Sequence, residues 1–297
     1  MAETGKLIRF GTRESQLALI QTGIVIRELK SFFLDWEMEI IGIKTQGDTS
    51  IDTTLSDVGG KELFVKEIEE ALFSGVIHLA VHSMKDVPYE LPKGLCIVAM
   101  TVREDPRDVF ISVDGKKFDE LEDGARIGTS SARRAIQLKE INPGIDVVPL
   151  RGNVSTRIAK MKEHRLDGIV LAAAGIHRLG MGHVITEYFT TDIMVPAIGQ
   201  GVLAVEACIG GEFNFVPRCI NHLDTEIAVR AERAFMKTLG GSCRVPIGAY
   251  AEVKGGTMFL IGLVERNGKI KKGKLSGEAS QAEDIGMKLA LELGGKT

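Results

Sequence analysis

Short apolar runs rich in strand-forming residues alternate along this chain with longer amphipathic stretches, and this alternation limits the possible folds more than any other feature. The apolar runs fall at residues 7–10, 39–43, 78–81, 95–100, 109–112, 147–150 and 168–171. The amphipathic stretches have apolar residues near helical spacing and fall at 15–30, 63–73, 131–140 and 154–163. Strands that alternate with helices are typical of α/β proteins. We therefore expect sheets covered by helices.

Two crossings divide the chain into domains. The polar segment 101–107 contains Pro106 and separates the first strand–helix set from the second, and we expect a return crossing near Pro196. We then expect a strand at residues 201–208, which could return to the first domain and make that domain discontinuous. A long helix at 225–239, strands at 247–253, 257–264 and 269–275, and a final helix predict a small α+β domain with an antiparallel sheet. The predicted domains are 1–101 with 197–218, 102–196, and 219–297.

Composition and charge exclude several classes of protein. A chain of 297 residues with 44% hydrophobic side chains can bury a substantial core. No segment approaches the roughly 18–20 uncharged apolar residues that span a bilayer, and the start of the chain carries no apolar signal segment. We therefore expect a soluble cytoplasmic protein, as a monomer and without a membrane partner. A net charge of −3, with one Trp and three Tyr, disfavours a nucleic-acid partner.

Arginines recur where predicted strands meet predicted helices. Ligands of open α/β sheets bind beyond the carboxyl ends of the strands, where a guanidinium group makes bidentate contacts with carboxylate or phosphate. The pattern predicts a site for a polyanion, although each arginine could also be an ordinary solvated charge at a helix end. The arginines concerned are Arg9, Arg13, Arg133, Arg134, Arg151, Arg157 and Arg178.

Small residues before two of these helices support an anion site only weakly. In GTSS, Ser130 or Ser131 would cap a helix whether or not it also touches a ligand, and Gly152 in LRGN could simply permit a turn. Neither segment matches GxxxxGK[ST], so the chain has no nucleotide-hydrolysing P-loop there.

An acid and a base stand side by side at the end of the segment VHSMKDVP. Lys85 and Asp86 follow an apolar strand and precede Pro88, which stops any helix. The carboxylate could stabilise a cationic intermediate or transfer protons, and the lysine could hold an anionic substituent. A surface turn with two solvated charges is the alternative.

Cys243 lies in the loop sequence LGGSCRVPIG. The neighbouring Arg244 would favour its thiolate, so this cysteine could be a nucleophile or an attachment point. An inert thiol is the alternative. The cysteines form neither a CxxC pattern nor a disulfide framework, so we expect no metal site.

Eleven segments, taken in order, resemble one family. They are GTRESQLAL, GDT, GGKELFVKEIE, AVHSMKDVP, REDPRDVF, GTSSARR, LRGNVSTR, AAAGIHRLG, PAIGQG, AERAF and GGSCRVPIGAY. In this combination the chain resembles the porphobilinogen deaminases, also called hydroxymethylbilane synthases. The resemblance covers essentially residues 7–253.

The resemblance implies a three-domain fold and a covalent cofactor. The fold would be α/β, with two doubly wound lobes like those of periplasmic binding proteins and a small C-terminal α+β domain with a three-stranded antiparallel sheet. The cofactor would be a dipyrromethane joined by a thioether to Cys243. The resemblance makes Asp86 the catalytic carboxylate. The cofactor- and substrate-binding residues that it implies are Arg9, Arg13, Ser15, Lys61, Lys85, Ser131, Arg133, Arg134, Arg151, Arg157 and Arg178.

The implied enzyme is a transferase of porphyrin (heme-type) tetrapyrrole biosynthesis. It would deaminate and condense four molecules of porphobilinogen on the dipyrromethane, and hydrolysis would then release the linear tetrapyrrole hydroxymethylbilane. Each porphobilinogen carries an acetate and a propionate, which explains the need for many arginines. Asp57 departs from the family, whose members often carry a lysine there. Two other functions stay open on sequence grounds: a non-catalytic bilobed anion-binding protein and, less favoured, a nucleic-acid-binding protein.

Overall fold

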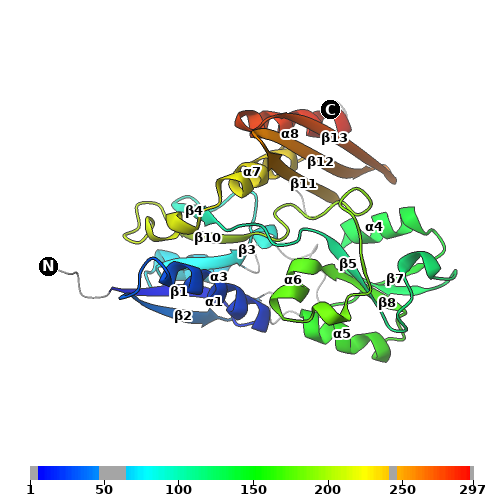
Figure 1. Ribbon diagram of the computed structural model, residues 1–297, viewed down its shortest axis with the longest axis horizontal. Coiled ribbons are helices and arrows are strands. Elements are labelled where there is room, and N and C mark those ends of the chain that lie inside the picture. Colours follow the sequence, from blue (N-terminus) through cyan, green and yellow to red (C-terminus); the bar gives the residue numbers. More distant parts are fainter. Residues whose placement is uncertain (1–5, 47–64, 241–245, 295–297) are drawn as a thin grey trace. The chain divides into compact units, whose positions relative to one another are not determined.

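The computed structural model describes residues 6–46, 65–240 and 246–294. The chain divides into two compact units. The first comprises residues 1–103 and 202–226, and the second comprises residues 104–201 and 227–297. Figure 1 shows the elements of each unit. In the described ranges, every helix is too short or too polar to span a membrane.

The first unit contains a five-stranded mixed sheet. Its order is β2 (Glu37–Ile43), β1 (Leu7–Arg13), β3 (Leu79–Ser83), β10 (Leu203–Cys208) and β4 (Leu95–Met100). The strands β2, β1 and β3 are parallel, whereas β10 runs antiparallel to both β3 and β4. The strand expected at 201–208 therefore does return to the first sheet.

Helices cover both faces of this sheet because side chains alternate along each strand. Helix α1 (Gln16–Lys30) packs against Phe10 and Leu79 on one face. Helix α3 (Lys66–Phe73) packs against Ala80 and its neighbours on the other. Apolar strands buried on both faces are the pattern expected of an α/β layer.

The second unit contains a sheet with the same strand arrangement. Its order is β7 (Asp146–Val148), β6 (Arg126–Gly128), β8 (Gly168–Ala172), β5 (Asp108–Ser112) and β9 (Glu187–Tyr188). Three parallel strands are again followed by an antiparallel pair of neighbours. In the first sheet the antiparallel fourth strand comes from the late segment β10, and in the second it is β5, the earliest strand of that sheet in the sequence.

Helices also cover both faces of the second sheet. Helices α5 (Val154–Glu163) and α6 (Ala173–Arg178) pack with Ile169 and Leu171. Helix α4 (Ala132–Ile141) packs on the opposite face, where Val170 is buried. The sequence pattern did not predict β6, β9 or α6, because these elements have only 3, 2 and 6 residues.

The C-terminal part forms an antiparallel sheet of β11 (Ile247–Lys254), β12 (Thr257–Arg266) and β13 (Lys269–Glu278). Helices α7 (Leu223–Thr238) and α8 (Ala282–Gly294) cover one face of it, around Phe235 and Leu289 (Figure 1). The predicted fold class is confirmed: two α/β lobes and a small α+β part with a three-stranded antiparallel sheet. The predicted domain boundaries stay a prediction.

Candidate active site

In the first unit, the sequence-predicted residues after β1 and β3 share one edge of the sheet. Phe10 pairs with Leu79, and Gly11 with Ala80, in parallel register. Parallel strands end at the same edge, so Arg13 at the end of β1 and the Lys85–Asp86 pair beyond β3 lie along it. Ser15 follows as the N-cap of α1, where its hydroxyl accepts a hydrogen bond from Ala18 N at 3.3 Å.

Asp86 lies on a short 3₁₀ turn, Met84–Asp86, that is fixed at several points. The backbone N–H of Met84 donates to Val202 O at 2.9 Å, and the Met84 side chain is buried. Just before the turn, Gln21 Nε2 donates to Ser83 Oγ at 2.9 Å, which ties α1 to the end of β3. Asp86 itself is half-buried. These contacts hold the backbone of the turn in place, and Asp86 stays partly exposed.

A buried contact between a histidine and a glutamate lies next to this turn and was not predicted from the sequence. His82 Nε2 lies 2.9 Å from Glu206 Oε2, and both side chains are almost completely excluded from solvent. The two residues come from the neighbouring strands β3 and β10. A single glutamate inside the apolar run of β10 was the only sequence signal for this pair.

Arg9 lies apart from the other predicted residues of the first unit. Its Nη2 donates to Gly75 O at 2.9 Å, and its backbone N–H donates to His78 Nδ1 at 3.1 Å. Burial and the neighbouring Arg9 charge lower the pKa of His78. Gly75 and His78 precede β3, so the guanidinium is held near the amino end of that strand. The assignment of Arg9 as an anion contact stays a prediction.

In the second unit, residues after β6 and β7 also gather at the carboxyl edge. Ser131 is the N-cap of α4 and accepts from Arg134 N at 3.4 Å. Ser130 Oγ donates to Leu150 O and accepts from Leu150 N, both at 3.0 Å. These bonds join the GTSS loop to the loop that leads into Arg151.

Arg133 and Arg134 project from α4 onto Asp108, which begins β5. Arg134 Nη2 lies 2.7 Å from Asp108 Oδ1, and Arg133 Nη1 lies 2.8 Å from Asp108 Oδ2. Complete burial alone would raise the pKa of Asp108, but the two guanidinium charges hold it well below its usual range. Asp108 was not singled out from the sequence. The sequence feature that could have pointed to Asp108 is an acidic residue at the start of the apolar run DVFIS.

Arg151 and Arg157 flank the start of α5. Gly152 between them has a φ of 121°, a backbone conformation that a residue with a side chain rarely adopts. Asn153 caps the helix, accepting a hydrogen bond from Thr156 N at 2.8 Å. Both arginines are half-buried.

Arg178 ends α6, the helix that follows β8 directly. Its Nη2 donates to Gly201 O at 2.7 Å, and burial lowers the pKa of its guanidinium to about 10. The preceding His177 lies 3.1 Å from Glu104 Oε1 and 2.9 Å from the Tyr188 hydroxyl. Because β6, β7 and β8 are parallel, Arg178 lies at the same edge as the arginines of α4 and α5.

Two of the predicted site residues, Lys61 and Cys243, lie outside the described residues, as does Asp57. Cys243 falls in the sequence between α7 and β11.

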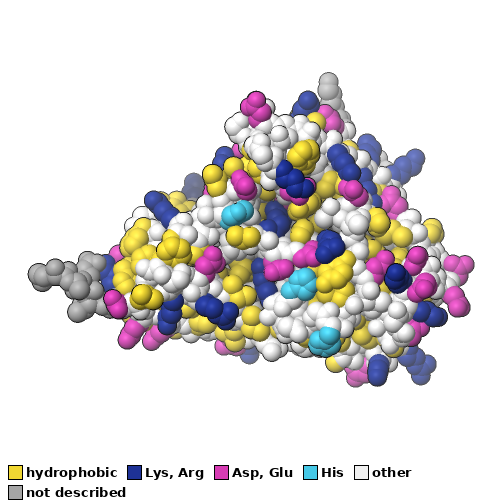
Figure 2. Space-filling view, viewed as in Figure 1, with side chains coloured by type: hydrophobic (Ala, Val, Ile, Leu, Met, Phe, Trp, Pro, Cys, Tyr) yellow, Lys and Arg dark blue, Asp and Glu magenta, His cyan; other side chains and the backbone are white. Residues whose placement is uncertain are grey.

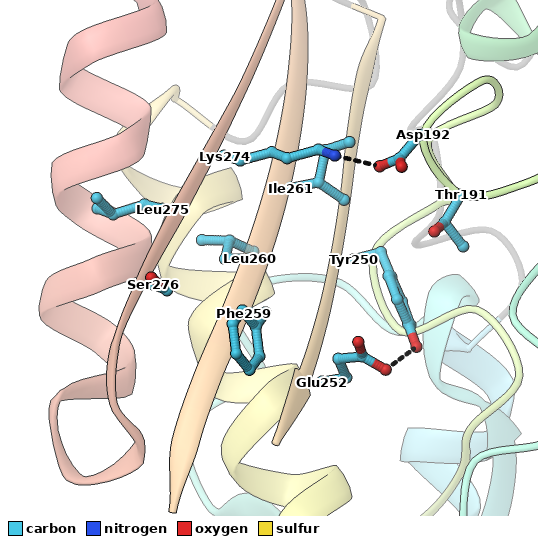
Figure 3. Close-up of a pocket in the computed structure, with 10 residues that line it drawn as sticks. All are labelled: Thr191, Asp192, Tyr250, Glu252, Phe259, Leu260, Ile261, Lys274, Leu275 and Ser276. Carbon is cyan, nitrogen blue, oxygen red and sulfur yellow. Dashed lines mark hydrogen bonds and ion pairs between the residues drawn. The ribbon is translucent and has the colours of Figure 1, made fainter. Parts of the chain in front are cut away.

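A separate pocket of about 360 Å³ lies between the C-terminal sheet and the segment that carries Thr191 and Asp192. Figure 3 shows two polar pairs in it: Lys274 with Asp192 at 2.7 Å, and the Tyr250 hydroxyl with Glu252 at 3.4 Å. None of the sequence-predicted site residues that the structure describes lines this pocket. Its charged groups are paired with each other, so it does not resemble a site for a polyanion.

Comparison with known proteins identifies the family. The model "Porphobilinogen deaminase, dipyromethane cofactor binding domain" matches residues 8–212, and "Porphobilinogen deaminase, C-terminal domain" matches residues 226–295. The chain belongs to the porphobilinogen deaminase family. A porphobilinogen deaminase of Clostridium botulinum (strain Loch Maree / Type A3) is 50% identical over 94% of this chain and 96% of its own length. A porphobilinogen deaminase of Trichlorobacter lovleyi is 49% identical over 98% of this chain and 95% of its own length.

The family establishes the broad chemistry. Porphobilinogen deaminases, or hydroxymethylbilane synthases, are transferases of tetrapyrrole biosynthesis with a dipyrromethane cofactor. Among solved structures, the periplasmic VFT2 domain of Bordetella pertussis BvgS is similar with a TM-score of 0.41 and 16% identity, covering 72% of this chain and 85% of that one. A TRAP periplasmic solute-binding protein from Desulfovibrio salexigens is similar with a TM-score of 0.43 and 11% identity. The match covers 75% of this chain and 74% of that one.

The described residues fit a cofactor of this kind. A dipyrromethane carries four carboxylates, which require cationic donors at a protected place. Arg133 and Arg134 are almost fully buried, and together they carry one more charge than the single carboxylate between them. A carboxylate of the cofactor would balance that excess charge.

Proposed function

We propose that this chain is a hydroxymethylbilane synthase that assembles four porphobilinogen molecules on a dipyrromethane bound through Cys243. The observation that carries the proposal is the gathering of cationic side chains at the carboxyl edges of both α/β sheets, beside Asp86 in the first and around Asp108 in the second. The family gives this arrangement its chemical meaning, because substrate, cofactor and product are all polycarboxylates.

Positively charged groups at the two edges would hold the carboxylates of the growing chain. In the first unit these groups are Arg13 and Lys85, with the hydroxyl of Ser15. In the second unit they are Arg133, Arg134, Arg151, Arg157 and Arg178, with the hydroxyl of Ser131. We propose Arg9 and Lys61 as further anion contacts on the basis of the family motifs. Guanidinium groups suit this task, because they stay charged when partly buried and bind carboxylates in a bidentate manner.

Asp86 would act on the reacting pyrrole. When ammonia leaves the aminomethyl group of porphobilinogen, positive charge develops on the ring and is shared with its N–H. A carboxylate held within hydrogen-bonding distance of that N–H stabilises the charge. The turn bonded to Val202 keeps Asp86 in position, so that little reorganisation is needed at the moment of reaction.

The bound dipyrromethane supplies the free pyrrole carbon on which the chain is extended. Cys243 would hold it by a thioether, and the neighbouring Arg244 in the sequence would favour the reactive thiolate. Covalent retention keeps the intermediates from diffusing away before water releases the tetrapyrrole.

We also propose a cytoplasmic monomer without a nucleic-acid partner. Figure 2 shows acidic and basic side chains interspersed on the face in view, rather than a surface of one sign. The net charge of −3 supports the same proposal. The division into domains 1–101 with 197–218, 102–196 and 219–297 is proposed with it.

The proposed function is tested by incubating the purified chain with porphobilinogen. We expect ammonia and hydroxymethylbilane, detected as uroporphyrin after ring closure and oxidation in acid. Binding of porphobilinogen without ammonia release would instead favour a non-catalytic anion-binding protein and would refute the proposal.

A further inference from the structure

Asp108 is the centre of a buried cluster that joins β5, α4 and the loop before β10. Its side chain is fully excluded from solvent. Asp108 Oδ1 accepts hydrogen bonds from Arg134 Nε at 3.1 Å, from Arg134 Nη2 at 2.7 Å and from Gln200 Nε2 at 3.0 Å. Asp108 Oδ2 lies 2.8 Å from Arg133 Nη1. One carboxylate therefore serves two guanidinium groups.

The two arginines use their donors differently. Arg134 donates through Nε and Nη2 to Asp108, and through Nη1 to Val170 O at 3.0 Å. In the part of the chain that the structure describes, the polar contacts of the Arg133 side chain both leave from Nη1, to Asp108 and to Val195 O at 2.6 Å. All three guanidinium nitrogens of Arg134 therefore donate to acceptors within the protein. Arg133 keeps one edge of its guanidinium for another acceptor.

The charges of the cluster do not cancel. Two cations face one anion, and each arginine is only 6% exposed. A buried charge without a partner is costly, so a cluster with one excess positive charge is most stable when one further anion completes it. Without Asp108 the cluster would carry two excess positive charges.

We propose that Asp108 is a positioning residue that orients Arg133 and Arg134 and cancels one of their charges, so that the cluster accepts one ligand carboxylate through Arg133. The proposal rests on the proposed function, in which these arginines hold carboxylates of the pyrrole chain. Asp108 touches neither substrate nor cofactor in this account. It acts through the geometry and net charge of the two arginines.

A charge-restoring pair of variants tests the proposal in the full-length protein. Asp108→Asn keeps the shape and removes the negative charge, which leaves an excess of two. Asp108→Asn/Arg134→Gln removes one cation as well and restores an excess of one. Asp114→Asn is the matched control, because its side chain is exposed and lies just beyond the other end of β5. The readouts are the thermal midpoint, its shift by inorganic phosphate, the fraction of chains carrying the cofactor, and kcat and KM for porphobilinogen.

We expect Asp108→Asn to lose about tenfold or more in kcat/KM, mainly through KM, because the guanidinium groups lose the orientation that a pyrrole carboxylate needs. Phosphate is small and responds mainly to net charge, so it should bind about tenfold more tightly than in the wild type. The double variant should return phosphate affinity to near the wild-type value and regain part of the lost stability and KM. If Asp108 only filled space, the double variant should be less stable than Asp108→Asn and have a higher KM, since it loses more native hydrogen bonds. A double variant that is no more stable than Asp108→Asn and that still binds phosphate as tightly as Asp108→Asn overturns the proposal.

Poor folding of Asp108→Asn does not prevent the test. In that case the yield and thermal midpoint of the double variant become the readout: rescue supports charge balance, and an equally unfolded double variant contradicts it. Failure of the proposed function is distinguishable, since it would appear in the wild type as absent cofactor and unconsumed porphobilinogen. Stability and phosphate binding would still report on Asp108.

Discussion

Replacement of Gly248 by alanine in the C-terminal sheet should disturb the cluster of Asp108, Arg133 and Arg134. Gly248 lies in β11, and a Cβ added there would be 2.9 Å from Pro196 O and 3.1 Å from both Arg133 Cδ and Val195 O. Two of these three atoms belong to the backbone. The carbonyl of Pro196 is also held by a hydrogen bond from Ala249 N at 3.1 Å, so it cannot withdraw freely.

The size of the effect follows from these contacts. An extra methyl group in a closely packed place costs about 1–3 kcal/mol. The backbone on one side is fixed, so part of the displacement should fall on Arg133, whose Nη1 donates to Val195 O at 2.6 Å. We therefore expect the free energy of unfolding to fall by about 1–3 kcal/mol, with a loss of several-fold in kcat/KM.

Chemical denaturation with activity measurement tests this prediction. Gly23→Ala is the matched control, since Gly23 lies inside α1 and an added Cβ would have nothing within 4 Å. That variant should be more stable by about 0.5–1 kcal/mol, because alanine favours a helix. If Gly248→Ala were as stable and active as the wild type, the close approach of β11 to Arg133 would be refuted.

Two further predictions concern single carboxylates. Asp86→Asn should fold and carry the cofactor but lose roughly 10²-fold or more in turnover; near-normal turnover, matching the exposed control Glu90→Gln, would contradict its catalytic role. Asp108 has a lowered pKa, so its stabilisation is present above its unfolded pKa of about 4 and is lost as the pH falls below that value. The wild type's stability advantage over Asp108→Asn/Arg134→Gln should therefore shrink between pH 6 and about pH 3 in urea unfolding, and a constant difference would refute the ion-pair assignment.

The sequence was sufficient for the layers of the fold but not for its short elements. The runs at 95–100 and 154–163 correspond to β4 and α5 with the expected bounds. Periodicity needs several residues to be recognised, so β6 and β9 gave no signal. The first strand extends to Arg13 rather than ending at Phe10, because parallel pairing with β2 carries the polar residues Thr12 and Arg13 into the sheet.

The candidate site was predictable as residue types and positions, but not as pairings. Arg13 and the arginines of the second unit follow strands whose carboxyl ends share an edge, whereas Arg9 lies near the amino end of β3. The role of these arginines as anion contacts stays a prediction. The partner of Arg134 could not be found in this way, because Asp108 lies 26 residues away in sequence on an antiparallel strand. The pairing of His82 with Glu206, 124 residues apart, is equally a product of tertiary structure.

Intact-mass measurement of the purified chain, before and after addition of porphobilinogen, tests the central claim most directly. The wild type should be heavier than its sequence by one dipyrromethane and should gain further discrete increments of one pyrrole unit with substrate. The Cys243→Ser variant should show neither. A wild type of unmodified mass that nevertheless forms hydroxymethylbilane, or a Cys243→Ser variant that still carries the cofactor, would contradict the account.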